Sequence, residues 1–158
     1  MPGAVFESSA FMRIEEIMTK QVLAIRPDAD AEAAWHQMRT ARIHHLVVID
    51  GAQIVGILSD RDLGGRNGAT IRKDRQVSEL MTPHAIVAAP ETSLRRAAQL
   101  LRGCTIGCLP VVDGKTLVGI VTATDLLDQL AKPANGKRAP GTARDARPSR
   151  PRSRAARA

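Results

Sequence analysis

The chain has 158 residues, 44% of them hydrophobic but only 2% aromatic, so its core must be built from aliphatic side chains. This length suits one compact domain, or two small halves that share a core, and it excludes a large multidomain enzyme. The net charge of +7 is concentrated in residues 132–158, where Asp145 is the only acid among nine Lys and Arg residues, so residues 1–131 lack the overall basic field of a nucleic-acid-binding domain.

The beginning of the chain does not resemble a signal peptide. Glu7 lies near its start, and no basic stretch is followed there by an apolar one. No apolar run approaches the ~18 residues that a membrane span requires. We therefore expect a cytoplasmic protein without a membrane partner.

An internal repeat with a spacing of 63 residues dominates the sequence. Residues 17–63 align with residues 80–126 without a gap, and 15 of 47 aligned positions are identical. One supersecondary unit is therefore used twice. The identical pairs include Met18-Thr19 with Met81-Thr82, Asp50-Gly51 with Asp113-Gly114, and Asp62-Leu63 with Asp125-Leu126.

The first copy predicts a strand at 22–25, followed by a helix that starts near Asp30. Apolar residues at 31, 34, 35 and 38 give this helix one buried face, on which Trp35 is a core residue. Two strands, 46–49 and 54–58, then flank a tight turn. A second helix is expected to begin at Ser59.

The second copy follows the same order. It predicts a strand at 86–88, a helix with its apolar stripe at 94, 97, 98 and 101, strands at 109–112 and 117–121, and a helix from Thr122. Gly64 to Gly68 should form a flexible or turning connection between the copies. Residues 132–158 are rich in Pro, Gly, Ser, Ala and Arg, have no large apolar residue, and are expected to be disordered.

The order strand, helix, strand, strand, helix, together with two local motifs, resembles the CBS domain. In the second copy the motifs are Leu109 to Asp113 and Gly119 to Leu126, and in the first copy they are Leu46 to Asp50 and Gly56 to Leu63. Val47 stands where the family usually has proline. The resemblance indicates a stand-alone tandem pair, often called a Bateman module, with CBS domains at 12–68 and 77–131 and a basic tail at 132–158.

The resemblance implies an α/β (α+β) fold in which two β-α-β-β-α repeats pack with pseudo-twofold symmetry and leave two clefts between them. Many such pairs form homodimers and bind AMP, ADP, ATP or S-adenosylmethionine in these clefts. It therefore implies a regulatory module without a cofactor, not an enzyme, which responds to an adenine nucleotide and acts on a separate, unidentified protein.

The candidate site residues lie where a strand meets a helix, at Ser59 and Asp62 and again at Thr122 and Asp125. One interpretation is a capping box, in which the hydroxyl and the acid satisfy free N–H groups of the first helical turn. The other is a nucleotide site, because a helix N-terminus favours phosphate and a carboxylate accepts hydrogen bonds from a ribose diol. The family uses these positions in the second way.

Three further residues complete the candidate list. Arg61 lies between the hydroxyl and the acid of the first copy, where the second copy has Thr124, so the first junction offers the better phosphate contact unless Arg61 only pairs with neighbouring acids. Adenine requires an apolar slot, which segments 43–47 and 106–110 could supply. His45 and Pro110 are weaker candidates there.

Two alternatives to a nucleotide sensor remain. His44-His45 and Cys104 with Cys108 suggest a metal site, but neither spacing matches a standard zinc pattern, and we predict free thiols and no metal. The basic tail could bind nucleic acid weakly, although such a composition is also typical of a solubilising end.

Overall fold

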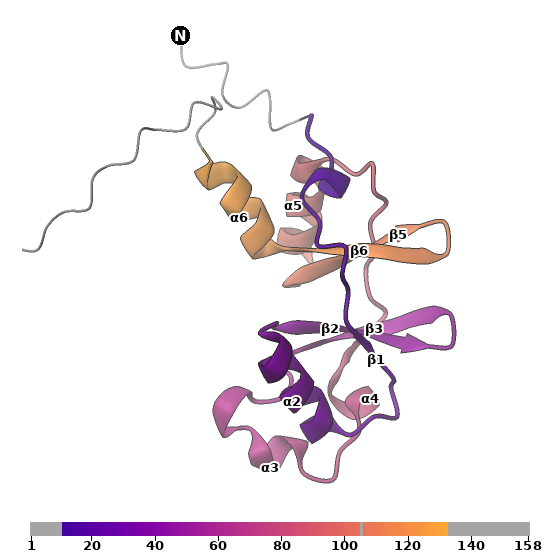
Figure 1. Ribbon diagram of the computed structural model, residues 1–158, viewed down its shortest axis with the longest axis vertical. Coiled ribbons are helices and arrows are strands. Elements are labelled where there is room, and N and C mark those ends of the chain that lie inside the picture. The colour runs from indigo at the N-terminus through magenta and orange to yellow at the C-terminus, as the bar shows by residue number, and fades with distance from the viewer. Residues whose placement is uncertain (1–10, 105, 133–158) are drawn as a thin grey trace, which may run out of the picture.

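The computed structural model describes residues 11–104 and 106–132, which form two halves stacked along the long axis of the molecule (Figure 1). Strand hairpins lie toward the middle, and helices lie toward the two ends. The lower half contains β1 (Ala24–Ile25), α2 (Ala31–Ala41), β2 (His45–Asp50), β3 (Gln53–Ser59), η2 (Gly65–Asn67), α3 (Ala69–Arg72), α4 (Val77–Leu80) and β4 (Thr82–Pro83). The upper half contains η1 (Ile14–Glu16), α5 (Leu94–Gly103), β5 (Cys108–Asp113), β6 (Thr116–Thr122) and α6 (Ala123–Ala131).

The mixed α/β architecture and its duplication confirm the predicted fold class. In each half an antiparallel hairpin forms around the predicted Asp-Gly turn, and Gly51 and Gly114 adopt the left-handed conformation that such a turn requires. The first of the preceding helices begins at the predicted Asp30, and the side chains of Asp30 and, in the second copy, Ser93 each cap their helix by accepting a hydrogen bond from the first turn. In the part of the chain that the structure describes, no helix is long and apolar enough to cross a membrane.

The short strand expected at the start of each copy is smaller than predicted. Residues 22–25 contribute only β1, which pairs in parallel with β2, and residues 86–88 contribute one bridge, between Ala88 and Val111. Val22, Leu23 and Ile86, which lie in these two segments outside the paired residues, line the cleft between the halves. The predicted disordered tail lies outside the described residues from position 133 onward.

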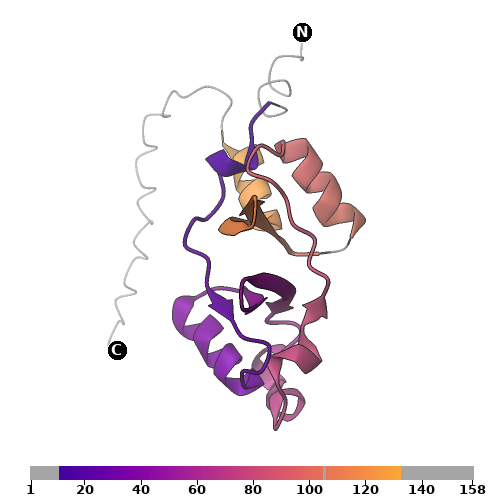
Figure 2. The ribbon, with the colours of Figure 1, turned by 90° about the vertical axis from the view of Figure 1, so that its right-hand side faces the viewer.

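The segment that precedes each repeat packs on the other repeat. Thr19 pairs with Ile120 in β6, and Thr82 pairs with Ile57 in β3. The two connections run on opposite sides of the molecule, as Figure 2 shows. Each half of the molecule is therefore completed by residues that belong, along the sequence, to the start of the other copy.

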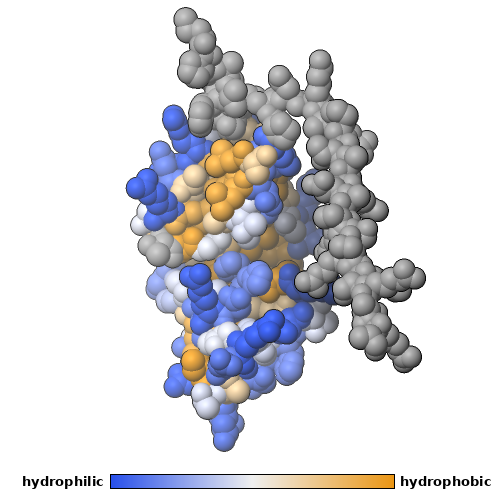
Figure 3. All heavy atoms as spheres, turned by 90° about the vertical axis from the view of Figure 1, so that its left-hand side faces the viewer, coloured by the Kyte–Doolittle hydropathy of each residue, from blue (hydrophilic) through white to orange (hydrophobic). Residues whose placement is uncertain are grey.

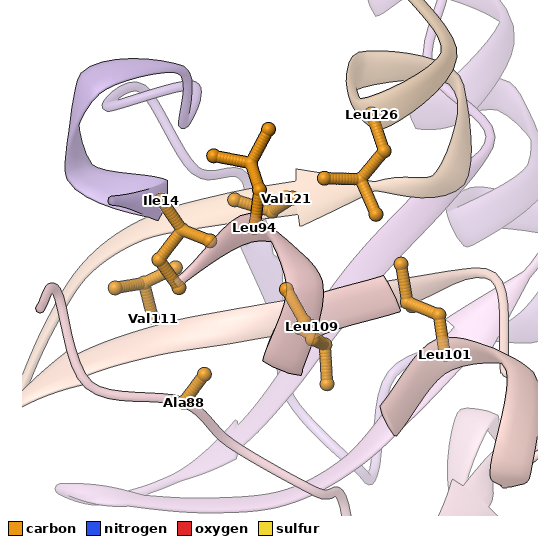
Figure 4. Packing of buried hydrophobic residues seen from close by; sticks show 9 residues of the cluster. Ile14, Ala88, Leu94, Leu101, Leu109, Val111, Val121 and Leu126 are labelled. Carbon is orange, nitrogen blue, oxygen red and sulfur yellow. The ribbon is translucent and has the colours of Figure 1, made fainter. Parts of the chain in front are cut away.

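Two aliphatic cores reflect the same exchange. In the upper core, Ile14 packs with Leu94 and Leu101 of α5 and with buried residues of β5, β6 and α6 (Figure 4). In the lower core, Val77 packs against Met38 of α2 and against residues of β2 and β3, and Trp35 is partly buried at its edge. The aliphatic composition of the chain is therefore sufficient to fill both halves.

The prediction of an α-helix beginning at Ser59 is wrong. In the second copy α6 begins directly after Thr122, whereas the first copy makes a single turn that ends at Gly64 and Gly65, both with positive φ. The left-handed conformation of these glycines ends the turn of the first copy. The aligned residues of the second copy are Leu127 and Asp128, which continue α6. The chain then forms η2, α3 and α4 before it returns to the sheet as β4.

Candidate functional site

One open cleft of about 1290 Å³ lies between the two halves. Equivalent positions of the two copies line it in pairs, so the pseudo-twofold relation extends to the cleft wall. The resemblance led us to expect two clefts between the halves, and the space beside both strand-to-helix junctions belongs to this one cleft. The paired lining residues include Thr19 with Thr82, Leu23 with Ile86, Ile43 with Ile106, Ile57 with Ile120, Ser59 with Thr122, and Asp62 with Asp125.

The first junction is a capping box closed on one carboxylate oxygen. Asp62 Oδ2 accepts hydrogen bonds from the backbone N–H of Ser59 at 2.7 Å and from its hydroxyl at 2.9 Å. The backbone N–H of Asp62 donates to Ser59 Oγ at 3.2 Å. No donor from a described residue reaches Asp62 Oδ1, so this oxygen remains able to accept a hydrogen bond from a ligand.

The second junction repeats this arrangement on the opposite wall. Asp125 Oδ2 accepts from the backbone N–H of Thr122 at 2.8 Å, and the backbone N–H of Asp125 donates to Thr122 Oγ1 at 3.2 Å. Oδ1 of Asp125 likewise has no donor among the described residues. The capping and ligand interpretations are therefore compatible, because each uses a different oxygen of the same carboxylate.

Arg61 is exposed on the cleft wall and forms no ion pair with any residue that the structure describes. Its neighbour Asp60 is instead bonded to His44, whose Nδ1 lies 2.8 Å from Asp60 Oδ2. The guanidinium is therefore available to an anionic group in the cleft. Thr124 stands at the matching position on the other wall.

His45 lies at the contact between the two halves. Its Nε2 approaches Gly107, where a Cβ atom would stand only 2.6 Å from it, so the absence of a side chain makes room for the imidazole. Burial lowers the pKa of His45 below its usual value, and the nearby Asp60 partly opposes that effect. The ring is therefore disposed to be neutral at physiological pH.

Pro110 lies apart from the other candidates. It is wholly buried in β5, where its carbonyl accepts a hydrogen bond from Ala88 at 2.9 Å, and it does not line the cleft. Apolar side chains from other positions form the slot that we expected near it. They are Val22, Leu23, Ile43, Ile57, Ala85, Ile86, Ile106 and Ile120.

Sequence reasoning missed His84 and the threonines of the Met-Thr pairs as cleft residues. His84 adopts a left-handed conformation with φ 56°, which is uncommon for a residue other than glycine, and it lines the cleft beside Thr82. The repetition of Met-Thr was the available signal for Thr19 and Thr82. No comparable sequence signal marks His84, because its aligned residue is Gln21.

The two thiols differ in exposure. Cys104 is exposed, whereas Cys108 is buried and the loss of solvent raises its pKa to about 12, so it remains a protonated thiol. Although both line the cleft with His44, His45 and His84, no three such side chains among the described residues are arranged to hold a metal ion.

Comparisons with known proteins agree with this architecture. The family described as the CBS domain matches residues 14–63 and 77–132. A CBS domain-containing protein of Bacillus subtilis is 32% identical over 125 residues, covering 78% of this chain and 89% of that protein.

Two solved structures share the fold. The hexameric CBS-CP12 protein from bloom-forming cyanobacteria superimposes with a TM-score of 0.68 at 30% identity, covering 74% of this chain and 67% of that one. The CBS domain pair of protein MJ0100, solved with 5′-methylthioadenosine and S-adenosyl-L-methionine, has a TM-score of 0.69 at 24% identity and covers 76% of this chain and 96% of that one.

Proposed function

The chain belongs to the CBS-domain family, and on that premise we propose that it is a regulatory module that binds an adenine nucleotide in the central cleft. The observation that carries this proposal is the pair of aspartates, Asp62 and Asp125. Each holds its junction with Oδ2 and leaves Oδ1 without a donor from the described residues. A ribose diol supplies two hydroxyl donors, which matches an acceptor of this kind.

The rest of the cleft supports an adenosine ligand with few phosphates. The apolar residues along both walls suit a purine ring. The described lining residues include three carboxylates, Asp60, Asp62 and Asp125, but only one guanidinium, that of Arg61. A triphosphate would therefore meet more negative than positive charge, so we propose AMP or the sulfonium compound S-adenosylmethionine before ATP.

We further propose that the module acts on a separate protein. The match to the Bacillus subtilis relative spans 89% of that protein, which supports a CBS pair that works without a catalytic domain fused to it. Ligand binding between two halves that share no continuous sheet can change how the halves are held together. A partner that contacts both halves would sense that change.

Asp62→Asn and Asp125→Asn test the ligand site. Asparagine can keep the cap with its carbonyl oxygen, but it then presents an NH2 donor where Oδ1 had accepted. We expect AMP affinity, measured by titration calorimetry, to fall about tenfold or more, while unfolding free energy changes by only about 0.5–1 kcal/mol. We expect one ligand at each junction and tighter binding at Asp62, because Arg61 lies beside it while Thr124 stands at the matching position near Asp125; Asp62→Asn should therefore remove the tighter binding event and Asp125→Asn the weaker one.

Asp128→Asn is the matched control, because Asp128 is an exposed acid of α6 outside the cleft and should not affect affinity. Unchanged affinity in both junction variants would place the ligand elsewhere. If wild-type protein binds none of AMP, ATP, 5′-methylthioadenosine and S-adenosylmethionine, the proposed function is wrong.

A further inference from the structure

Arg72 is the only buried charged residue in the part of the chain that the structure describes, at 2% exposure. It ends the short helix α3, which follows the first strand-to-helix junction along the chain. Its guanidinium lies over the ring of Trp35 at 4.5 Å, and its Nε donates to Glu32 Oε2 at 2.7 Å. Both partners belong to α2, so Arg72 is anchored to the long helix of the lower half.

The other end of the guanidinium holds the turn beside the cleft. Arg72 Nη1 donates to the carbonyl oxygens of Leu63 at 2.8 Å and Gly65 at 2.7 Å. Leu63 directly follows Asp62, which lines the cleft together with Arg61, and Gly65 lies two residues after Leu63. One buried side chain therefore connects α2 to the backbone that carries half of the candidate ligand site.

The broken helix explains why this turn requires such support. In the second copy, the residues after Asp125 continue as α6, and successive turns hydrogen-bond to one another. In the first copy, Gly64 ends the helix after one turn, so no described amide reaches the carbonyl oxygen of Leu63, whereas that of Gly65 also accepts a hydrogen bond from the backbone N–H of Gly68 at 3.2 Å. A single turn is marginal by itself, because few hydrogen bonds offset its ordering entropy.

We propose that Arg72 is a positioning residue for the ligand cleft: it replaces the missing helix of the first copy by fixing the Leu63–Gly65 turn, and thereby holds Asp62 and Arg61 toward the ligand. Its planar fork of donors can satisfy two carbonyls and a carboxylate together, which a lysine cannot do with the same geometry. The effect on ligand binding rests on the proposed function, whereas the effect on the turn does not.

The first test uses the ligand-free protein. Arg72→Met keeps apolar contact with Trp35 but removes every donor. We expect amide hydrogen exchange at Asp62, Gly64 and Gly65 to accelerate about tenfold or more, while exchange in α6 stays unchanged. Arg39→Met is the matched control, because Arg39 lies over the same ring at 5.6 Å but bonds to neither carbonyl.

The second test measures AMP affinity by calorimetry, with S-adenosylmethionine as the alternative probe. We expect Arg72→Met to weaken binding about tenfold and to have little further effect in an Asp62→Asn background, because both changes act on the same half of the site. The Asp125→Asn background should leave the full effect of Arg72→Met visible. A role limited to global stability would give no such dependence on background.

Arg72→Lys covers the case in which the methionine variant does not fold. It keeps the charge and one donor group but loses the fork, so partial acceleration of exchange at Gly64 and Gly65 is expected. The proposal would be overturned if Arg72→Met and Arg72→Lys both exchanged the amides of Gly64 and Gly65 at the rate of the Arg39→Met control. Wild-type protein that binds no probe would refute the proposed function instead, since the exchange experiment tests the turn by itself.

Discussion

Protonation of His45 opposes folding. Its imidazole is half-buried between the halves, and burial lowers its pKa from the ordinary value. The neutral ring occupies the space that Gly107 leaves free, whereas a charged ring would be poorly solvated there. The contact between the two repeats therefore depends on pH through this side chain.

We predict that the protein becomes less stable as the pH falls from about 7.5 to about 5. The unfolded chain binds a proton at His45 near pH 6.5, but the folded chain binds it only at lower pH, so acid favours unfolding and the stabilisation is fully present only above that range. Urea denaturation across this pH range should show a shallower slope for His45→Gln than for wild type. The exposed His36→Gln serves as control, and an identical slope in wild type and His45→Gln would contradict the prediction.

Single residues also show how far sequence reasoning extends into the site. Thr122 and Asp125 were placed at a helix start by local spacing alone, and the structure brings them together there. His84 could not be found, because its left-handed backbone follows from the path of the chain between β4 and Ala88. Pro110 was misplaced for a related reason: its motif is local, but whether its strand faces the cleft or the core depends on tertiary packing.

At the scale of elements, the predicted helices, hairpins and turns were largely recoverable from apolar periodicity and the Asp-Gly pairs. The exchange of segments between the copies was not, because pairings such as Thr19 with Ile120 join residues about a hundred positions apart. The α-helix expected to begin at Ser59 does not form, because Gly64 and Gly65 end it after one turn. The sequence marks both glycines as turn residues but predicts that they lie in a connection after the helix, whereas they lie at its end.

Gly56→Ala tests the packing of the exchanged segment in the lower half. A Cβ atom on Gly56 would stand 2.7 Å from both Met81 Sδ and the carbonyl oxygen of Thr82, and the second of these is backbone that cannot easily move. We expect a loss of about 1–3 kcal/mol in unfolding free energy, measured by chemical denaturation. Gly103→Ala, with no such neighbour within 4 Å, should be neutral or stabilising, and equal losses in both variants would be inconsistent with this account.

At the scale of the whole molecule, α6 carries an apolar face that the described chain does not cover. Leu127 and Leu130 are 64% and 66% exposed, and Figure 3 shows hydrophobic surface on the upper half of the side where α6 lies. Exposed leucines on one helix face are typical of a contact with another chain. We therefore predict that this chain forms a homodimer through α6.

If the chain forms a dimer through α6, substitutions in α6 should lower the molecular mass measured in solution. Light scattering at tens of micromolar should give twice the chain mass for wild type and a shift toward the monomer for Leu127→Glu and Leu130→Glu, because a buried carboxylate opposes association. Val87→Glu, an exposed apolar position outside α6, should remain dimeric. A wild-type monomer would refute the proposal.

The exchange of segments also suggests an evolutionary history. A chain with only one repeat could bury Ile14 or Val77 only by lending its leading segment to a second copy, so the simplest ancestor of this arrangement is an interlocked pair of short chains. Joining two such copies in tandem would preserve every contact and remove the entropy cost of association. After such a fusion, each copy could diverge while its leading segment still packed in the core of the other copy. The helix of the first copy could then be lost at Gly64, while the second copy kept α6.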